Sequence, residues 1–283
     1  MTRPCPACES RDARDAGEKN AHRLVRCRRC RTLFTAAAVS ADYDGYYAHG
    51  NPDIPAFVEA RTDQIVAGFA SARTTGRLLD VGFGAGTFLE AARRGGWAAE
   101  GVEMSPDAVA GARALGFDAF HGTLAEARYP EAHFDVVIAS EVVEHVIDVR
   151  AMLEEIHRIL RPGGLLWATT PHGRGISARL LGTGWSVVAP PEHVQLFSVG
   201  GLRALLRAAG FRDVRIAAES VNPREILDGL RGHRVGGHER VESGYAINAF
   251  LSASPWRRAL KRAANGMLSR FRLGDSLKIA ARR

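Results

Sequence analysis

From residue 77 to the last residue, short apolar runs alternate with longer segments in which apolar residues recur every three or four positions. The short runs have the length of buried strands, and the longer segments have the period of amphipathic helices. We therefore expect strands at residues 77–81, 97–103, 117–120, 134–140, 164–170, 212–219 and 276–281. Helices are expected at residues 87–94, 106–115, 150–160 and 199–210. This alternation predicts an α/β fold with a doubly wound, seven-stranded, Rossmann-like sheet.

The remaining segments divide the chain into further parts. Residues 1–40 hold all four cysteines, residues 41–75 are expected to be helical, and the core comprises residues 76–222 together with 273–283. The insertion at 223–272 begins with a stretch rich in Gly, Arg and His, which predicts a flexible flap or a substrate wall.

The second half of the insertion has apolar residues at positions 256, 260, 264, 267, 268 and 271. This spacing predicts an amphipathic helix whose apolar side packs on the sheet and whose cationic side faces solvent. A weak contact of the cationic side with a membrane surface is an alternative.

The cysteines form two C-x-x-C pairs with 18 residues between them: Cys5, Cys8, Cys27 and Cys30. This is the spacing of a closed, four-thiolate zinc site. A ribbon of this length cannot bury a core of its own, so bound zinc would supply its folding free energy. Two disulfides are the alternative, which a reducing compartment disfavours. The sequence therefore predicts an N-terminal zinc ribbon with a structural metal.

Charge is unevenly distributed along the chain. Residues 1–40 carry nine Arg or Lys and four Asp or Glu, and residues 256–283 carry nine and one, so the middle is acidic although the net charge is +7. A catalytic face that grips a polyanion is not expected from an acidic middle, which argues against nucleic acid as the partner. The first residues contain no apolar leader and no run is long enough to span a bilayer, so we expect a cytoplasmic location.

The stretch "LLDVGFGAG" ends the first core strand in Asp80 and then places three glycines at every second position before a helix that begins at Thr87. Backbone N–H groups and a helix N-terminus face any ligand bound there. A dinucleotide fingerprint needs its third glycine where Thr87 stands. The second strand ends at Glu103, a carboxylate suited to ribose hydroxyls. The pattern favours a nucleoside ligand without a pyrophosphate.

Six segments in this order resemble the class I S-adenosylmethionine-dependent methyltransferases, in particular the small-molecule branch that includes the ubiquinone biosynthesis O-methyltransferases. They are "LLDVGFGAGTFL", "GVEMS", "FDVVIASEVVEHVID", "ILRPGGLLWATTP", "PPEHVQLFS" and "GDSLKIAAR". The resemblance covers roughly residues 40–222 and the last strand. It implies an antiparallel last strand, S-adenosylmethionine as the cofactor, and a helical segment at 41–75 that covers it.

The resemblance also implies which residues contact the cofactor. The acid and glycines after the first strand would surround its methionine moiety, and residues at the end of the second strand would hold the ribose and adenine. A later turn would line the adenine edge, and the end of the fourth strand would return to the methionine moiety. These residues are Tyr47, Asp80, Gly82, Gly84, Gly86, Glu103, Met104, Gly122, Thr123, Leu124, Ser140 and Glu141. For Tyr47, simple packing of an amphipathic ring is the alternative.

Three histidines follow core strands and are candidates for acid–base chemistry. His193, in "PPEHVQLFS", lies in the loop that faces the acceptor in the family, and we expect it to be the general base. His145, in "SEVVEHV", is expected to order the loop and the cofactor. His172 would only line the pocket. A purely structural histidine is the alternative for His193.

Two absences narrow the expected chemistry. No "NPPY" follows the fourth strand, which argues against methylation of base amino groups, and no acid pair ends the fifth strand, so no catalytic metal is expected. The predicted function is methyl transfer to a small-molecule acceptor (a sugar, a lipid precursor or a secondary metabolite), with oxygen favoured over carbon or nitrogen. The alternatives are an RNA methyltransferase that grips RNA with the zinc ribbon, where Phe34 is the only aromatic residue, and a catalytically silent binding module. The sequence does not indicate an oligomeric state.

Overall fold

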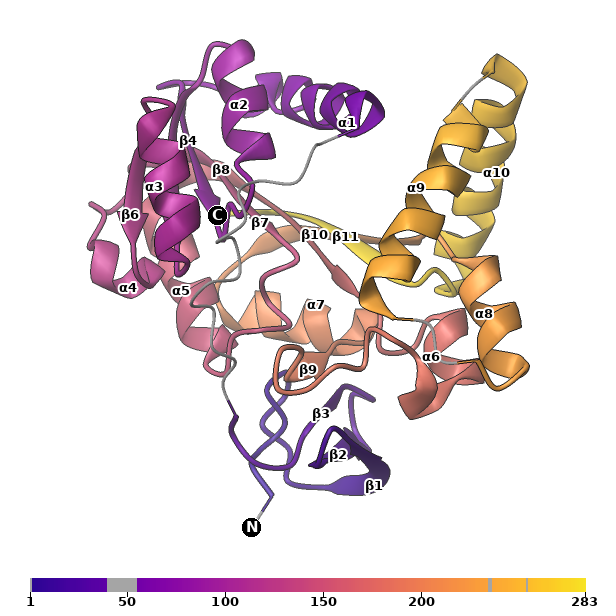
Figure 1. The fold of residues 1–283 in the computed structure, drawn as a ribbon. Coiled ribbons are helices and arrows are strands. Elements are labelled where there is room, and N and C mark those ends of the chain that lie inside the picture. The colour runs from indigo at the N-terminus through magenta and orange to yellow at the C-terminus, as the bar shows by residue number, and fades with distance from the viewer. Residues whose placement is uncertain (1, 40–54, 234–235, 253) are drawn as a thin grey trace.

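The computed structural model describes residues 2–39, 55–233, 236–252 and 254–283. Its main sheet has seven strands in the order β10-β11-β8-β7-β4-β5-β6 (Figure 1). The pairs from β8 to β6 are parallel, and β11 is antiparallel to both of its neighbours. The strands are β4 (Arg77–Val81), β5 (Ala98–Glu103), β6 (Asp118–His121), β7 (Phe134–Ser140), β8 (Leu160–Pro171), β10 (Arg212–Glu219) and β11 (Ser276–Arg282). The predicted seven-stranded sheet and its antiparallel last strand are confirmed.

The central strands are buried on both faces. In β7, every residue from Phe134 to Ala139 is buried, and so are the residues of β4 after Arg77. Parallel strands covered by helices on both sides read as continuous apolar runs, which is why the sequence pattern located them.

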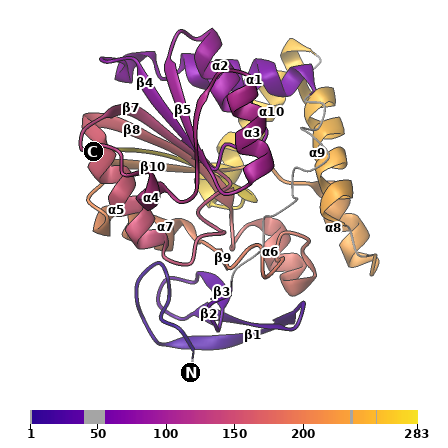
Figure 2. The ribbon, with the colours of Figure 1, turned by 60° about the vertical axis from the view of Figure 1, so that its left-hand side comes forward.

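Helices cover both faces of the main sheet (Figure 2). On one face α5 and α7 contribute Leu153 and Leu202 to a core that includes Leu79, and on the other face α1 and α2 pack around Leu78. Adjacent strand residues thus serve opposite faces. The helices of this part are α1 (Ala56–Ala67), α2 (Thr87–Arg94), α3 (Pro106–Ala114), α4 (Leu124–Ala127), α5 (Val149–Ile159), α6 (Ile176–Leu180) and α7 (Val199–Ala208), with 3-10 turns η1 (Ala70–Ala72) and η2 (Gly182–Gly184).

The N-terminal segment forms a small second sheet with a strand from the core. Strands β1 (Ala13–Lys19), β2 (His22–Cys27) and β3 (Leu33–Thr35) are antiparallel neighbours. Strand β3 then pairs with β9 (Gln195–Leu196), which lies in the loop between β8 and α7. The N-terminal sheet is therefore completed by the chain of the main domain, and no sequence pattern predicted this pairing.

The insertion after β10 is helical where the structure describes it. It forms α8 (Pro223–Leu230), α9 (Gly237–Ser252) and α10 (Pro255–Phe271). The segment predicted to be a flexible flap or a substrate wall is thus helical in α8 and α9, and its role stays a prediction. Asn222 caps α8 by accepting the Glu225 N–H, and Pro223 occupies its first turn. These are ordinary helix-start signals that the Gly and His content of the segment obscured.

Helix α10 forms where an amphipathic helix was predicted, but its apolar side does not pack on the sheet. It has no buried residue, and Trp256, Met267 and Phe271 are each more than 60% exposed. Polar side chains contact the sheet instead: Asn265 accepts the Ser220 N–H, and a serine of α10 accepts a β10 amide. The expected packing was therefore wrong. Within the described residues, no helix is long and apolar enough to cross a membrane.

Candidate functional site

The turn between β4 and α2 needs glycine at all three predicted positions. Gly82, Gly84 and Gly86 have φ angles of 66°, 51° and 76°, a region that L side chains rarely adopt. A Cβ on Gly82 would lie 2.7 Å from a methyl group of Val142. Gly86 is the N-cap residue of α2, so the helix N-terminus opens toward this turn. The N–H groups of the three glycines donate within the protein, to the Val102 carbonyl, the Glu103 carboxylate and the Phe83 carbonyl. A ligand at this turn would therefore face the N-terminus of α2 rather than these amides.

Asp80 is buried immediately before this turn and one of its carboxylate oxygens, Oδ2, has no hydrogen-bond partner among the described residues. Burial raises the pKa of this carboxyl well above its usual range, and the charge of Glu103 raises it further. Leaving a buried acceptor unsatisfied is costly, so a ligand with a cationic donor would stabilise the site. The ammonium group of the expected methionine moiety fits this requirement.

Glu103 ends β5 beside the same turn. Its Oε2 accepts the Gly84 N–H at 3.0 Å, and its Oε1 accepts the N–H groups of Met104 at 2.6 Å and Ser105 at 3.0 Å. A carboxylate accepts about four hydrogen bonds, so it must release at least one of these amides to bind both hydroxyls of a ribose. The side chain of Met104 is 46% exposed and open to contact with a flat ring.

The three residues that were predicted to line the adenine edge follow β6, and each has a different structural role. The Gly122 N–H donates to the Glu103 carbonyl at 3.0 Å, which joins this turn to the end of β5. The Thr123 side chain forms a capping box with Glu126 at the start of α4. Leu124 is buried in the main core. The side chains of Thr123 and Leu124 therefore support the fold, and the Thr123 N–H also donates within the protein, to Glu126 at 2.8 Å.

The end of β7 is the third part of this edge. Ser140 shares a hydrogen bond of 2.9 Å with the hydroxyl of Thr169 on β8. Glu141 has a φ angle of 55°, and its N–H donates to the Thr169 carbonyl at 2.9 Å. A non-glycine residue with positive φ is strained and is often found at functional sites. Tyr47 lies outside the described residues.

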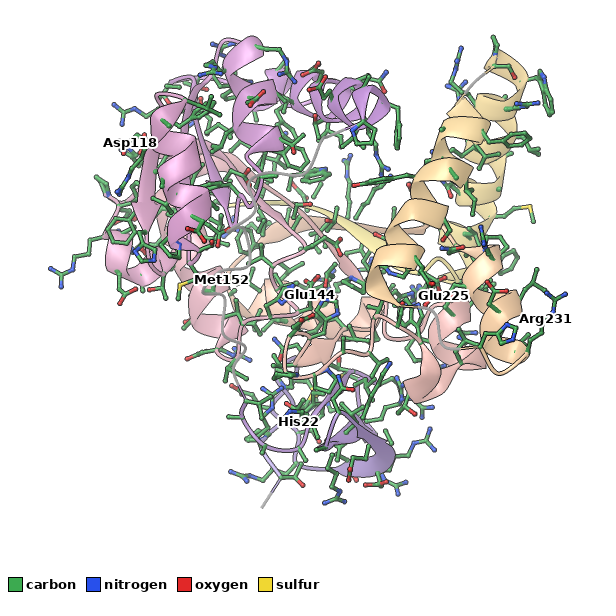
Figure 3. The ribbon with its side chains drawn as sticks, viewed as in Figure 1. His22, Asp118, Glu144, Met152, Glu225 and Arg231 are labelled. Carbon is green, nitrogen blue, oxygen red and sulfur yellow. The ribbon has the colours of Figure 1, made fainter. Side chains whose placement is uncertain are left out.

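The structure brings the two predicted histidines together and adds an acid that the sequence analysis missed. Glu144, His145 and His193 each offer a ligand atom, and these atoms lie within 4.8 Å of one another. The two imidazole rings are in edge-to-face contact with their centroids 4.7 Å apart. Figure 3 shows Glu144 near the centre of the molecule, between the main sheet and the N-terminal sheet. We call these three residues the central cluster.

Hydrogen bonds to the backbone fix the tautomers of both rings. The Nδ1 of His145 is 3.0 Å from the Glu192 carbonyl, and the Nδ1 of His193 is 2.6 Å from the Val187 carbonyl. A carbonyl only accepts, so each Nδ1 carries the proton and each Nε2 carries the lone pair. Burial lowers the pKa of His145 to about 4 and also lowers that of His193. Both rings are therefore neutral near pH 7.

Glu144 is fully buried, and its Oε2 accepts a hydrogen bond of 2.9 Å from the Thr170 hydroxyl. Its Oε1 has no partner among the described residues. Burial and the nearby charge of Glu141 raise the pKa of Glu144 well above its usual range. A neutral acid beside two neutral imidazoles is suited to proton transfer, and the same donor set is suited to a divalent cation. In sequence, this glutamate looks like a solvated charge, and only its burial distinguishes it.

His172 has a structural position, apart from the central cluster. It is buried, and its Nδ1 is 2.8 Å from the Gly274 carbonyl. The backbone N–H of His172 donates to the Asp275 carbonyl at 2.8 Å. His172 therefore joins the end of β8 to the start of β11.

The N-terminal sheet is attached directly to the loop that carries His193. Arg3 donates to the Val194 carbonyl at 2.9 Å and to the side-chain oxygen of Gln195 at 3.3 Å. The amide of Gln195 donates in turn to the carbonyls of Val143 at 2.9 Å and Val146 at 2.6 Å. The carbonyl of Glu144 accepts the N–H groups of Val194 and Gln195. The two loops of the central cluster are thus tied to each other and to the N-terminal segment.

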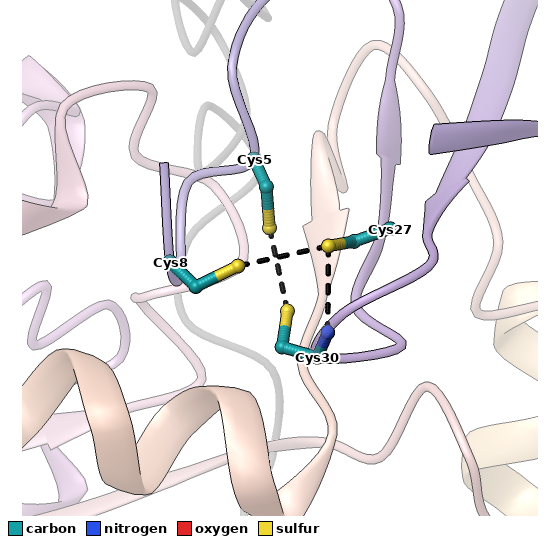
Figure 4. Close-up of side chains that lie close together, drawn as sticks. All are labelled: Cys5, Cys8, Cys27 and Cys30. Carbon is teal, nitrogen blue, oxygen red and sulfur yellow. Dashed lines mark hydrogen bonds between the residues drawn. The ribbon is translucent and has the colours of Figure 1, made fainter. Parts of the chain in front are cut away.

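The four cysteines converge in this N-terminal segment (Figure 4). The Sγ atoms of Cys5 and Cys30 are 3.4 Å apart, and those of Cys8 and Cys27 are 3.6 Å apart. None of these cysteines, all of which are described, forms a disulfide. Tetrahedral zinc with Zn–S bonds of about 2.3 Å places its sulfurs about 3.8 Å apart, so the donor set fits this metal. The Ser198 hydroxyl donates to the Cys30 carbonyl, which links the cluster to the N-cap of α7.

Comparisons with known proteins agree with this geometry. Residues 55–216, more than half of the chain, match the family model of a methyltransferase domain. A probable S-adenosylmethionine-dependent methyltransferase of Mycolicibacterium smegmatis is 34% identical over 132 residues, which are 46% of this chain and 48% of that protein. A ubiquinone biosynthesis O-methyltransferase of Bradyrhizobium is 39% identical over 100 residues, which are 33% of this chain and 39% of that protein. The matched parts thus span less than half the length of these relatives.

The fold also resembles solved structures. The crystal structure of a S-adenosylmethionine-dependent methyltransferase from Archaeoglobus fulgidus superposes with a TM-score of 0.54 and 20% identity, covering 80% of this chain and 93% of that one. At this identity, the likeness concerns the fold alone.

Proposed function

Since the chain belongs to the methyltransferase domain family, we propose that it transfers a methyl group from S-adenosylmethionine to a small-molecule acceptor. The observation that carries the proposal is the buried, unpartnered Oδ2 of Asp80 beside a turn of three positive-φ glycines. This combination provides a carboxylate for the ammonium of the methionine moiety, beside the N-terminus of α2, which would face the carboxylate of that moiety.

When bound, S-adenosylmethionine supplies a methyl group that its sulfonium makes electrophilic. The protein then has to hold the acceptor in line and exclude water. Asp80 and the glycine turn would bind the methionine moiety, and Glu103 would bind the ribose. His193 would accept the acceptor's proton at Nε2, with its Nδ1–H bond to the Val187 carbonyl holding the ring.

The proposed acceptor is a sugar, a lipid precursor or a secondary metabolite, methylated on oxygen in preference to carbon or nitrogen. A neutral imidazole with a free lone pair at Nε2 is needed to deprotonate a hydroxyl or a carbon acid, and an amine acceptor has less need of it. Because the cofactor product is a neutral thioether that needs no proton, a base alone is sufficient for a hydroxyl acceptor. These features support oxygen as the acceptor atom.

Zinc in this proposal is structural, held by the four cysteine thiolates with no open position for chemistry. A protein that needs four reduced thiols suits the reducing cytoplasm, which we include in the proposal.

The cofactor assignment predicts the effect of removing the Glu103 carboxylate. Glu103→Ala is expected to weaken S-adenosylmethionine binding by about 1.5 to 3 kcal/mol, because a charge-assisted hydrogen bond to the ribose is lost. This corresponds to a roughly 10- to 150-fold higher Kd, measurable by titration calorimetry. Asp118→Ala removes an exposed carboxylate from the neighbouring strand β6 and is the matched control. Equal affinities of the wild type and the Glu103 variant would exclude the ribose contact.

RNA remains the second acceptor class to test. Arg11, Arg14 and Arg29 of the N-terminal segment are solvent-accessible in the structure, which favours this alternative. RNA binding through phosphates would weaken steeply with salt. If the acceptor is a small molecule, a labelled RNA should not be shifted in gel retardation at either of two salt concentrations. Tight RNA binding at low salt that disappears at high salt would favour the RNA alternative.

The exposed side of α10 supports a weak contact with an anionic membrane surface. Residues 255–274 contain six Arg or Lys and no Asp or Glu, and Trp256 and Phe271 are each 63% exposed. Aromatic and cationic side chains on one helix are suited to a lipid–water interface. We expect cosedimentation with phosphatidylglycerol vesicles and none with phosphatidylcholine vesicles. Arg262→Ala should weaken binding to the phosphatidylglycerol vesicles roughly fivefold, because each cation near the surface contributes about 1 kcal/mol. Equal binding to both vesicles would contradict the contact.

A further inference from the structure

A cavity of about 560 Å³ lies between the insertion helices and the edge of the main sheet. Its walls include Ile247 and Leu251 from α9 and Leu260 and Leu268 from α10, and its floor is formed where β10 ends and β11 begins. Trp185 closes one side. Small-molecule sites are mostly apolar and of about 300 to 1,000 Å³, so the cavity has the size and lining of such a site.

The two acids that line this cavity are already occupied. Glu225 accepts hydrogen bonds from the Ser186 N–H at 3.1 Å and from its hydroxyl at 2.5 Å. Asp275 accepts from the Ser177 N–H at 2.9 Å and from its hydroxyl at 2.6 Å. Burial raises the pKa of Asp275 to about 6, which weakens its negative charge near neutral pH. These acids serve to hold α8 and β11 against the segments before β9.

The two cations that line the cavity have no carboxylate partner among the described residues. Lys261 donates only to the side-chain oxygen of Asn248, at 2.7 Å. The guanidinium of Arg240 makes no hydrogen bond or ion pair within the described part of the chain. Burial lowers the pKa of Lys261, the charges of Arg61 and Lys278 lower it further, and the charge of Glu219 raises it. Asp275 lies within electrostatic range of Arg240, and Glu219 within that of Lys261, but neither carboxylate forms a direct ion pair with these cations among the described residues. A bound anion in contact with both cations would therefore stabilise this end of the cavity.

The cavity is also coupled to the central cluster. The charge of Arg240 contributes to the lowered pKa of His193, after burial, and it also acts on Asp275 at the cavity floor. Arg240 therefore lies within electrostatic range of both places. The chain connects them as well, because Trp185 in the cavity wall and Val187, which binds the His193 ring, belong to one short segment.

Building on the proposed function, we infer that this cavity binds the body of the acceptor, and that the acceptor is an anionic amphiphile. Its apolar part would lie between α9 and α10, and its carboxylate or phosphate would meet Arg240 and Lys261. The group to be methylated would then extend toward His193. A carboxylate and a phosphate would bind these two cations in the same way, and the experiment below compares them.

The test uses the full-length protein saturated with S-adenosylhomocysteine and three probes below their micelle concentrations: laurate, dodecyl phosphate and the neutral 1-lauroylglycerol. In titration calorimetry, laurate or dodecyl phosphate should bind at about one per chain, and 1-lauroylglycerol at least about tenfold more weakly. Arg240→Ala and Lys261→Ala should each lower the affinity for the anionic probe roughly 10- to 100-fold. Arg207→Ala, which removes an exposed cation of α7 that does not line the cavity, should leave the affinity for the anion unchanged.

A second variant tests the cavity separately from its charges. Ile247→Trp fills the space and keeps both cations, so it should abolish binding of the anionic probe. Undiminished binding to Ile247→Trp, or equal affinity for the neutral probe, would overturn the inference. Titration of S-adenosylhomocysteine alone reports on the proposed function: if it binds and the anions do not, the inference fails and the methyltransferase assignment stands. If the anions bind and S-adenosylhomocysteine does not, the assignment fails.

Discussion

Cys27→Ser is expected to release the zinc and to reduce turnover about 100-fold, while affinity for S-adenosylmethionine changes little. The apparent free energy of zinc binding in structural sites is about 10 to 16 kcal/mol, and this free energy folds the ribbon. With the ribbon unfolded, β3 no longer pairs with β9, and the loop of His193 loses the contacts of Arg3. Misplacing a catalytic group by about 1 Å costs on the order of a hundredfold in rate. The cofactor turn follows β4, which pairs with β5 and β7 and with no strand of the N-terminal sheet, so we expect it to keep its contacts.

Two measurements and a control variant separate this effect from general unfolding. Metal analysis should give about one zinc per wild-type chain and much less for the variant. Amide hydrogen exchange at Val194 and Gln195, whose N–H groups donate to the Glu144 carbonyl, should increase. Arg29→Ala changes an exposed residue between Cys27 and Cys30 and should behave as the wild type. A zinc-free variant with normal turnover would show that the ribbon does not support the central cluster.

His193→Ala is expected to lower turnover by at least about a hundredfold and to leave cofactor affinity unchanged. General-base catalysis contributes typically 10²- to 10⁴-fold, and the Nε2 of His193 carries the lone pair that can accept the proton. The acceptor for this assay comes from a screen of labelled methyl transfer to anionic amphiphiles. His22→Ala, a change in β2 away from the cluster, is the control.

The role of His193 as a general base also predicts how turnover depends on pH. A base acts in its neutral form, and the pKa of His193 lies below its ordinary value of 6.5 because the ring is buried. Turnover should therefore be flat from pH 7 to 9 and should fall only below pH 6.5, as the ring becomes protonated. The acid limb should be absent from His193→Ala. An identical pH profile in both proteins would leave proximity as the main catalytic device.

The sequence located the central strands β4 and β7 because they are buried on both faces. Strands β4, β7 and β10 have the predicted bounds, and the glycine turn after β4 has the positive φ angles that its spacing suggested. Local patterns carry this information: continuous apolar runs for the central parallel strands, and glycines where the φ angles are positive, of which Gly82 also leaves no room for a side chain beside Val142. The convergence of the four cysteines also follows from spacing alone.

What the sequence could not show are contacts between distant segments. Strand β9 has two residues and pairs with β3, more than 150 positions earlier, so no local periodicity marks it. Glu144 resembles any exposed acid until the fold buries it between two loops. The apolar stripe of α10 has the period of a packed helix, and only the tertiary structure shows that Asn265 and Ser269 make the contacts to β10 instead.

Titration calorimetry of the purified protein with S-adenosylmethionine and, in parallel, with NADH tests the central claim most directly. We expect micromolar binding of about one S-adenosylmethionine per chain, lost on replacing Asp80 with alanine, and no measurable binding of NADH. Binding of NADH in preference to S-adenosylmethionine would contradict it.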